Sequence, residues 1–421
     1  MLSTLTCSEP SDEVPSLDRP LRILMVAPQP FFRPRGTPFS VLHRVRALGE
    51  AGCRIDLVTY PFGADVNLPG LRIIRARRVP GIHDVKIGPS LAKVALDLSL
   101  MAATIRALAT EAYDVVHSHE EAAFFCAWLA RRRGLLHVYD MHSSLPQQLA
   151  NFDAFNFSPF RKVFEYFERH VLTSCDGVIT ICQELADVAA EIAPGTPRAM
   201  IENTGDDTAV FSATRGSVAP EVAALTGPVV LYTGTMEAYQ GIDLLLEAFR
   251  FVSLERPDAS LVLVGGRVEQ IARFQREAER LGVADRTHFV GQVDPSSIPA
   301  YIDAATVIVS PRSSGTNTPL KIYGYLRSGK PIVATNLRTH TQILNPRVAE
   351  LAPPTAEGLA AGLLRVLQDP ARAAALAAEA RKLADSEYSD TRYRERVVNF
   401  YNMVIRGSET QFGRAAPVTA P

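Results

Sequence analysis

Short apolar runs rich in β-branched residues alternate with helical patterns along most of this 421-residue chain. In the first half the runs expected to form strands are LRILMVA (21–27), RIDLVTY (54–60), YDVVHSH (113–119), LLHVYDM (135–141), GVITI (177–181) and RAMIE (198–202). After residue 205 the pattern starts again with PVVLYTG (228–234), SLVLVGG (260–266), THFVG (287–291), ATVIVSP (305–311) and KPIVAT (330–335). Such alternation is typical of βαβ units, so the sequence predicts an α/β protein with two doubly wound domains in tandem.

The two sets of strands define the expected domain boundaries. We expect a disordered tail over 1–20, a first domain over 21–205, a second domain over 206–385, a helix over 386–405 and a disordered tail over 406–421. The helix is expected because apolar residues recur at helical spacing at Tyr393, Val397, Phe400, Tyr401 and Val404. Ligands of such sheets bind outside the carboxyl ends of the strands, so a cleft between the domains is the expected site.

Charge and cysteine usage limit the function classes. Lys and Arg (44) nearly equal Asp and Glu (45), which argues against a protein that coats nucleic acid through bulk charge. The five cysteines are odd in number and form no CxxC pair, so neither a disulfide framework nor a zinc site is indicated and a reducing cytoplasm fits best. The N-terminus lacks the basic and apolar regions of a secretory signal. The longest apolar stretch (91–109) contains three charged residues and is expected to be an amphipathic helix, not a membrane span.

One polar loop followed by a short helix is a candidate phosphate site. In SSGTNTPLKIYGYLRSGKPIVAT (313–335) the helix can be capped by any of three residues, Thr316, Asn317 or Thr318. Free backbone N–H groups at such a start attract anions, whereas Lys321 in the first turn opposes the helix dipole. A bound phosphate facing Lys321 explains the residue; a side chain that points into water explains it equally well.

The first strand is followed by a similar connection, QPFFRPRGTP. There Gly36 allows a ligand to approach the backbone closely, and Arg35 adds charge beside it. The chain has no Asp-x-Asp pair, GxxxxGK[ST] loop or GxSxG elbow, and the first turn lacks GxGxxG. These absences argue against kinase, hydrolase and dehydrogenase functions.

Three histidines, His117, His119 and His142, stand at expected strand ends. Structural imidazoles are commoner than functional ones, so each alone is more simply a structural residue. His142 is the preferred functional candidate, because it is followed by the polar SSLPQQ and can orient or polarise a sugar hydroxyl or a phosphate. His119 with Glu120 is the second candidate, for acceptor binding.

Several stretches together resemble those of a family 4 glycosyltransferase of the GT-B fold, from residue 21 to about 405. They are PRGTPFSVLHRVRALGEAGCRIDLVTYP, DVVHSH, VYDMHS, IEN, VVLYTGTMEAYQGIDLLLEAF, LVLVGG, HFVGQV and TPLKIYGYLRSGKPIVAT. The resemblance implies two Rossmann-like domains that face a central cleft, with a last helix that crosses back to the first domain. It also implies a retaining hexosyltransferase of glycan or glycolipid synthesis that uses a nucleotide-diphosphate sugar, with no essential metal and no other cofactor.

The resemblance assigns roles by position. His142 matches the histidine that contacts the donor sugar, and Gly36 with Thr37 matches the loop near the diphosphate. Lys321 matches a lysine of some members, and Gly234 closes the first strand of the donor domain. Backbone groups at Val290 and the residues after it lie where the family holds the base.

Four positions depart from the family pattern. The usual diphosphate-binding Arg and Lys fall on Thr235 and Gln240, and the usual paired glutamates fall on Thr316 and Gly324. One explanation is a divergent enzyme in which other donors, among them Asn317 and Thr318, hold the substrate. Another is an inactive partner of a second transferase. A UDP-sugar 2-epimerase is a third, less favoured, because it needs acid–base carboxylates in the cleft.

Basic residues are concentrated in the expected first domain, at 72–78 (RIIRARR), Lys86, Lys93 and 131–133 (RRR). With the amphipathic stretch 91–109 they can rest on the inner face of an anionic membrane, where a lipid-linked acceptor would be met. An ordinary solvated surface is the simpler explanation of the same pattern.

Overall fold

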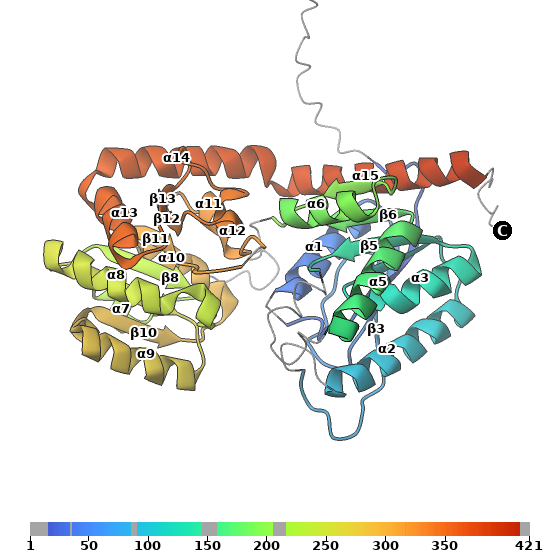
Figure 1. Ribbon diagram of the computed structural model, residues 1–421, viewed down its shortest axis with the longest axis horizontal. Helices are drawn as coiled ribbons and strands as arrows, with labels where there is room; N and C mark the ends of the chain where they lie inside the picture. Colours follow the sequence, from blue (N-terminus) through green and yellow to red (C-terminus); the bar gives the residue numbers. More distant parts are fainter. Residues whose placement is uncertain are drawn as a thin grey trace, which may run out of the picture. The chain divides into compact units, whose positions relative to one another are not determined.

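The computed structural model divides the chain into two compact units and describes residues 16–33, 36–85, 91–144, 158–204, 216–315 and 317–412 (Figure 1). Unit 1 consists of Met1–Ile181, Leu185–Ile201 and Thr391–Pro421, and unit 2 of Cys182–Glu184 and Glu202–Asp390. The end of the chain thus belongs to unit 1.

Unit 1 contains a seven-stranded sheet in the order β3-β2-β1-β4-β5-β6-β7, with every neighbouring pair parallel. The strands are β1 (Arg22–Ala27), β2 (Arg54–Thr59), β3 (Leu71–Arg75), β4 (Val115–His119), β5 (Leu136–Met141), β6 (Gly177–Thr180) and β7 (Arg198–Met200). The central strands β1 and β4 are almost fully buried, as parallel strands covered on both faces are. The edge strand β3 was not predicted from the sequence.

The helices of unit 1 are α1 (Thr37–Glu50), α2 (Leu91–Thr110), α3 (Ala122–Arg133), α5 (Ser158–Ser174), α6 (Gln183–Ile192) and α15 (Asp390–Phe412). α15 extends beyond the end predicted at 405. Its Val404 and Phe400 pack directly against Gly177 of β6, because a Cβ at that glycine would lie only 2.6 and 2.7 Å from them. Asp18, in a segment predicted to be disordered, pairs with Arg406 of α15 at 2.8 Å. The described ends of the chain are therefore ordered parts of unit 1.

Unit 2 contains a six-stranded sheet in the order β10-β9-β8-β11-β12-β13, and all its neighbouring pairs are parallel. The strands are β8 (Val229–Thr233), β9 (Ser260–Val264), β10 (Thr287–Gly291), β11 (Val307–Ser310), β12 (Ile332–Thr335) and β13 (Glu350–Ala352). The α-helices are α7 (Pro220–Ala223), α8 (Ile242–Glu255), α9 (Val268–Leu281), α10 (Ile298–Ala304), α11 (Lys321–Arg327), α12 (Arg338–Thr341), α13 (Ala356–Gln368) and α14 (Pro370–Glu387). The short η3 (Ala238–Gln240), η4 (Ala284–Arg286) and η5 (Pro295–Ser297) are 3₁₀-helices.

The strand orders identify where each sheet can bind a ligand. In both sheets the first strand lies at the centre, and the direction of winding reverses between β1 and β4 and between β8 and β11. In a doubly wound fold ligands bind at such a switch point, outside the carboxyl ends of the strands.

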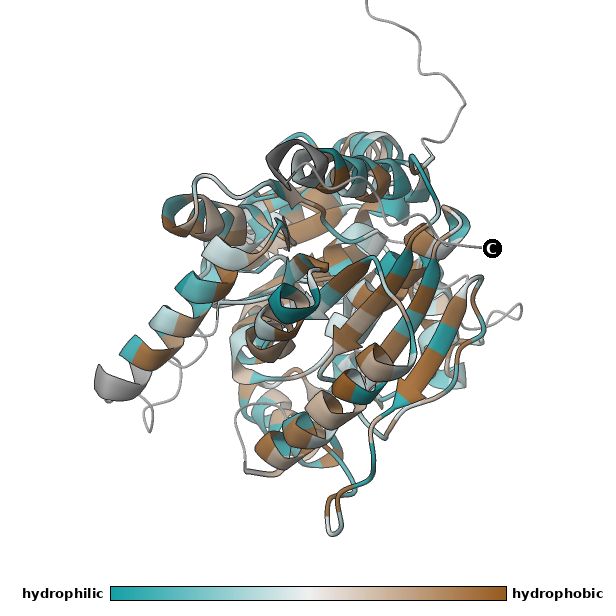
Figure 2. Ribbon diagram, turned by 90° about the vertical axis from the view of Figure 1, so that its right-hand side faces the viewer, coloured by the Kyte–Doolittle hydropathy of each residue, from teal (hydrophilic) through white to brown (hydrophobic). Residues whose placement is uncertain are grey.

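Hydropathy follows this architecture. Figure 2 shows mostly hydrophobic strands and helices that carry both hydrophobic and hydrophilic residues. The stretch predicted as an amphipathic helix is α2, with Leu96 and Leu100 buried and Leu98 59% exposed. Among the residues that the structure describes, no helix combines the length and apolarity needed to cross a bilayer.

Candidate functional site

The carboxyl ends of β8 and β9 are bare backbone. Gly234 and Gly265 follow these strands with φ of 138° and 115°, a conformation that side chains rarely adopt. A Cβ on Gly265 would lie 2.0 Å from the Gly234 carbonyl oxygen, so the two segments touch through their main chains. A ligand at this edge can approach the backbone directly.

Two cationic side chains reach the switch point of unit 2. The Lys321 ammonium lies 3.9 Å from the centre of the Tyr232 ring and 3.3 Å from the Thr233 carbonyl oxygen, at the end of β8. Arg312 follows β11, and its Nη1 donates to the Asn317 carbonyl oxygen at 2.6 Å. In the described part of the chain, neither cation pairs with a carboxylate.

The environment of these cations favours an anionic ligand. Although part of the Lys321 side chain is exposed, burial of its ammonium and then the charge of Arg312 hold the pKa of Lys321 well below its usual range. Burial also lowers the pKa of Arg312, whose Nε makes no hydrogen bond to any described residue. A phosphate nearby would favour the charged form of both groups, which makes an anion such as phosphate a well-suited ligand.

The helix start itself differs from the prediction. α11 begins at Lys321, its N-cap residue is Leu320, and no side chain caps it. The predicted caps at Asn317 and Thr318 are therefore wrong, because the chain enters the helix through a turn at Leu320; Thr316 lies outside the described residues. Lys321 is the first residue of α11, and its long side chain reaches the end of β8.

Arg312 was not predicted from the sequence. It lies beside the loop after β8, where Thr235 and Gln240 are neutral. Thr235 is exposed, and the Gln240 Oε1 is buried without a hydrogen bond to described residues. The loop after β11 packs on this segment, since a Cβ on Gly241 would lie 2.0 Å from the Pro311 carbonyl oxygen. Arg312 thus brings a cation to a loop whose own candidate residues are neutral. A basic residue directly after a strand was the signal that could have found it.

Val290 lies at an irregularity of β10. The register with β9 passes from Phe289 to Gly291 and leaves Val290 without a partner in the ladder. Such a bulge frees backbone groups from the sheet. Gly324, the remaining predicted residue of unit 2, is partly buried within α11.

The switch point of unit 1 brings together residues that are far apart in the sequence. Gly36, with φ 49°, precedes α1, and the Thr37 hydroxyl donates to Glu120 Oε1 at 3.0 Å. Glu120 follows β4 and also has a positive φ of 49°, which is uncommon for a residue with a side chain. The structure thus places Gly36, Thr37 and Glu120 together, whereas Arg35 lies outside the described residues.

Several carboxyl groups lie close to one another beside this loop. Burial and then the charge of Glu121 raise the pKa of Glu120 to about 7. Burial and then the same Glu121 raise the pKa of Asp97 to about 7, although Tyr60 donates a hydrogen bond to it. The Lys93 ammonium lies 2.5 Å from Glu121 Oε1. The cluster therefore holds protons near neutral pH.

Asp97→Asn tests the protonation of this cluster. The pKa of Asp97 is about 7 when folded against an ordinary 3.8, so the native state holds an extra proton between these values and its free energy of unfolding falls as pH rises through them. The variant keeps an acceptor for the Tyr60 hydroxyl, but it has no carboxyl group at this position whose titration lowers the free energy of unfolding. We expect its stability relative to the parent to be about 3–4 kcal/mol more favourable at about pH 8 than at about pH 4, measured by denaturant unfolding. An equal difference at both pH values would contradict the assignment.

The predicted histidines form a buried cluster around Asp140. His119 Nδ1 and His142 Nε2 are 2.9 Å apart, and His142 Nε2 lies 3.4 Å from Asp140 Oδ1. Asp140 Oδ2 accepts from Arg44 Nε at 2.8 Å and lies 3.3 Å from His117 Nε2. The sequence analysis did not identify Arg44 or Asp140, although a charged residue within an apolar strand is a signal of a buried partner.

Electrostatics make the imidazoles neutral and the carboxyl group an anion. Burial opposes ionisation of Asp140, but Arg44 and then the neighbouring imidazoles outweigh it and hold the pKa of Asp140 well below its usual range. Burial lowers the pKa of His142 to about 4 and that of His119 well below its usual value. At neutral pH each ring therefore carries one N–H and one lone pair.

Within the part of the chain that the structure describes, this cluster also contains a group of side chains that could hold a metal ion. Ligand atoms of His117, His119 and Asp140 lie within 4.8 Å of one another. The Arg44 guanidinium, however, is bound to the same carboxylate at 2.8 Å and would repel a metal cation. We therefore interpret the cluster as a hydrogen-bonded network.

Two family models match most of the chain. The model described as Glycosyltransferase Family 4 matches residues 34–204, and the model described as Glycosyl transferases group 1 matches residues 218–383. The first covers the described switch point of unit 1, and the second covers that of unit 2.

Named relatives have similar lengths. The phosphatidyl-myo-inositol mannosyltransferase of Mycobacterium leprae is 25% identical over 336 residues, which cover 79% of this chain and 83% of the relative. The D-inositol 3-phosphate glycosyltransferase of Acidothermus cellulolyticus is 29% identical over 362 residues, which cover 80% of this chain and 76% of the relative.

Solved structures share the fold. Sucrose-phosphate synthase from Thermosynechococcus elongatus has a TM-score of 0.74 at 21% identity, covering 92% of this chain and 100% of that chain. Anabaena HepE in complex with UDP has a TM-score of 0.65 at 16% identity, covering 93% of this chain and 100% of that chain.

Proposed function

This chain belongs to the family 4 glycosyltransferases of the GT-B fold, and we propose that it is a retaining enzyme that uses a nucleotide-diphosphate sugar. The observation that carries the proposal is the pair of cations, Arg312 and Lys321, at the switch point of unit 2. They lack a carboxylate partner among the described residues, and a diphosphate supplies the missing charge. The UDP in the HepE structure, a protein of the same fold, supports this choice of ligand.

We assign the donor to unit 2 by the chemistry of each contact. Arg312 and Lys321 would bind the diphosphate, the bare ends at Gly234 and Gly265 would allow close approach, and the backbone around Val290 would bind the base. Neutral Thr235 and Gln240 can donate or accept hydrogen bonds but bring no charge. Arg312 thus offsets the cations that the loop after β8 lacks.

In the proposed reaction the bond between the anomeric carbon and the diphosphate oxygen breaks. A bond from the acceptor oxygen forms on the same face of the sugar, and the proton of the acceptor hydroxyl passes to the departing phosphate. Negative charge grows on that phosphate, so Arg312 and Lys321 would stabilise the transition state more than the ground state. We propose that His142 contacts the donor sugar, and His119 and Glu120 the acceptor.

A nucleotide-release assay with a panel of UDP- and GDP-sugars tests this function. The named relatives act on inositol-containing acceptors, so phosphatidylinositol and inositol 3-phosphate belong in the acceptor panel. We expect nucleotide release that depends on an acceptor, with retained anomeric configuration in the product. If neither turnover nor nucleotide binding is detected, the inactive-partner alternative is supported. If the sugar is changed in the absence of any acceptor, the epimerase alternative is supported.

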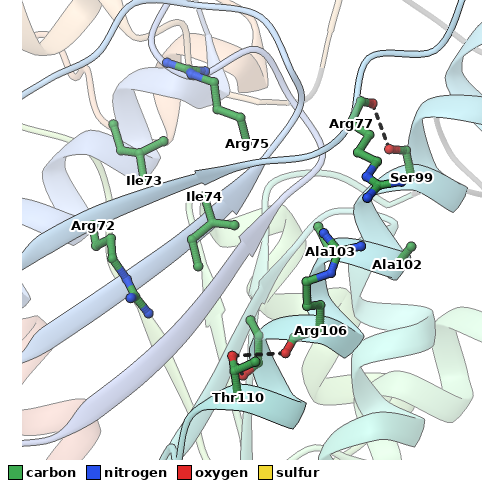
Figure 3. Close-up of a pocket in the computed structure, with 11 residues that line it drawn as sticks. Arg72, Ile73, Ile74, Arg75, Arg77, Ser99, Ala102, Ala103, Arg106 and Thr110 are labelled. Carbon is green, nitrogen blue, oxygen red and sulfur yellow. Dashed lines mark hydrogen bonds between the residues drawn. The ribbon is translucent and has the colours of Figure 1, made fainter.

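We also propose that unit 1 contacts an anionic membrane, where a lipid-linked acceptor would lie. A cavity of about 330 Å³ opens between β3 and α2 (Figure 3). Its lining includes four arginines and no acidic residue: Arg72, Arg75, Arg77 and Arg106. On α2, the side chains of Val94, Leu98 and Ile105 are 56, 59 and 41% exposed. Arg72 and Arg75 are paired with carboxylates, whereas Arg77 and Arg106 have no carboxylate partner among the described residues. Exposed apolar side chains on a helix that also carries basic residues favour an interfacial position.

Substitution of two of these arginines tests the membrane contact. Arg75 is held by Asp65 and by backbone carbonyl groups, and Arg72 by Asp56, so Arg77 and Arg106 are the better targets. We expect Arg77→Gln with Arg106→Gln to weaken the binding free energy to anionic liposomes by about 2 kcal/mol, a factor of about 30 in affinity. Co-sedimentation measures this affinity.

The matched control is Arg273→Gln with Arg280→Gln on α9 of unit 2, which should bind liposomes as the parent does. Equal binding by the Arg77 and Arg106 variant and the parent would exclude this face as the contact.

A further inference from the structure

The short helix α12 of unit 2 holds the side chain of Arg312. The Thr339 side chain of this helix is fully buried, and its hydroxyl donates to the Asn317 carbonyl oxygen at 2.7 Å. The same hydroxyl accepts from Arg312 Nη1 at 2.8 Å, and Nη1 also donates to the Asn317 carbonyl oxygen at 2.6 Å. Arg312, Asn317 and Thr339 therefore form a closed triangle of hydrogen bonds.

The backbone of Arg312 is held from the neighbouring strand. The Thr335 hydroxyl, at the end of β12, donates to the Arg312 carbonyl oxygen at 2.6 Å. The buried His340 ring of α12 contacts the ends of both strands, because its Nε2 lies 2.9 Å from the Ser310 hydroxyl of β11 and its Nδ1 lies 2.9 Å from the Thr335 carbonyl oxygen. Arg312 is thus fixed at its main chain as well as at its side chain.

The triangle uses one corner of the Arg312 guanidinium and leaves an edge open. Nη1 makes both hydrogen bonds of the side chain, whereas Nε and Nη2 make none to any described residue. The N–H bonds of Nε and Nη2 lie along one edge of the group, from which a guanidinium can bind two oxygens of a phosphate. A Cβ on Gly315 would lie 3.1 Å from Nη2 and 3.2 Å from Nε, so the glycine leaves this edge uncovered.

We infer that Thr339 is a positioning residue for the donor, which holds the Nη1 corner of Arg312 so that the Nε–Nη2 edge faces a phosphate group. The inference rests on the proposed function, since the phosphate is that of the nucleotide-diphosphate sugar. A hydroxyl suits this role because it accepts from the guanidinium without neutralising it. A carboxylate in the same place would take the charge that the diphosphate needs.

Thr339→Val in the full-length protein tests the role, because it removes the hydroxyl and keeps the shape of the side chain. We expect the dissociation constants of UDP and GDP, measured by isothermal titration, to rise about tenfold, as the loss of a hydrogen bond to a charged group does. In the assay of nucleotide release kcat should also fall, since Arg312 would act mainly on the transition state. Thr339→Ser keeps the hydroxyl and should restore both values.

Thr287→Val is the matched control. Thr287, at the start of β10, is also buried and donates to a backbone carbonyl group, of Val283 at 2.9 Å, but at the amino end of its strand. It should bind UDP and GDP as the parent does.

A double variant distinguishes positioning of Arg312 from a general effect on the fold. If Thr339 acts through Arg312, then adding Thr339→Val to Arg312→Ala should not weaken nucleotide binding further. The same additional loss in both backgrounds would overturn the inference.

The remaining outcomes separate the inference from the proposed function. Equal affinity of the parent and Thr339→Val for UDP and GDP, or a serine variant as weak as the valine variant, would overturn the inference and leave the proposed function intact. The expected affinities in a protein without sugar transfer would support the inference and refute only the transfer. A parent that binds neither nucleotide would refute both.

Discussion

Lys321→Ala is expected to abolish sugar transfer and to weaken the binding of a nucleoside diphosphate about tenfold to hundredfold. The Lys321 ammonium lies against Tyr232 and the Thr233 carbonyl oxygen and has no carboxylate partner among the described residues. Its charge is therefore available to a diphosphate and not consumed within the fold. Arg312→Ala should have a similar effect on affinity. Isothermal titration with UDP and GDP measures the binding, and nucleotide release measures the transfer.

Lys330→Ala is a matched control for the lysine. Its ammonium also donates to a backbone carbonyl group, of Asp303 at 2.8 Å, but at the surface, so full activity is expected. Gly324→Glu, which restores the carboxylate usual in the family, should keep measurable activity. Full activity of Lys321→Ala would overturn the assignment of the diphosphate to this lysine.

The sequence predicted most of the strands, and the exceptions have a physical reason. Every predicted run corresponds to a strand within a few residues, because buried parallel strands are continuous apolar segments. The edge strand β3 reads LRIIR, with an arginine at each side of its apolar pair, and β13 has only three residues. Such short or polar edges carry little signal of their own and are formed by pairing with a neighbouring strand.

The sites were predicted less completely, because pairing across long separations is not visible in one sequence. Gly36, Thr37 and Glu120 were separate candidates in the sequence and lie together in the structure, as do His119 and His142. Arg312 was overlooked since SPRSSG reads as an ordinary turn. The Arg44–Asp140 pair joins residues 96 positions apart, and only the tertiary fold brings them together.

Replacing either partner of that pair is expected to cause the largest loss of stability. Arg44 and Asp140 have side-chain exposures of 1 and 0%, so Arg44→Met leaves a buried carboxylate without its cation, and Asp140→Leu leaves a buried guanidinium without its anion. Each change should lower the free energy of unfolding of unit 1 by about 3–5 kcal/mol. Denaturant unfolding followed by circular dichroism measures this loss.

The double variant separates the cost of an unpaired charge from the value of the pair. Arg44→Met with Asp140→Leu leaves no buried charge of this pair, so it should be more stable than either single variant. Arg46→Met is the control on the same helix: Arg46 is 31% exposed and pairs with Glu50 at 3.0 Å, and its loss should cost about 1 kcal/mol or less. If the two single losses at Arg44 and Asp140 simply add in the double variant, the ion pair is not the cause. The buried network beneath His142 would then have to be stabilised by its imidazole contacts alone.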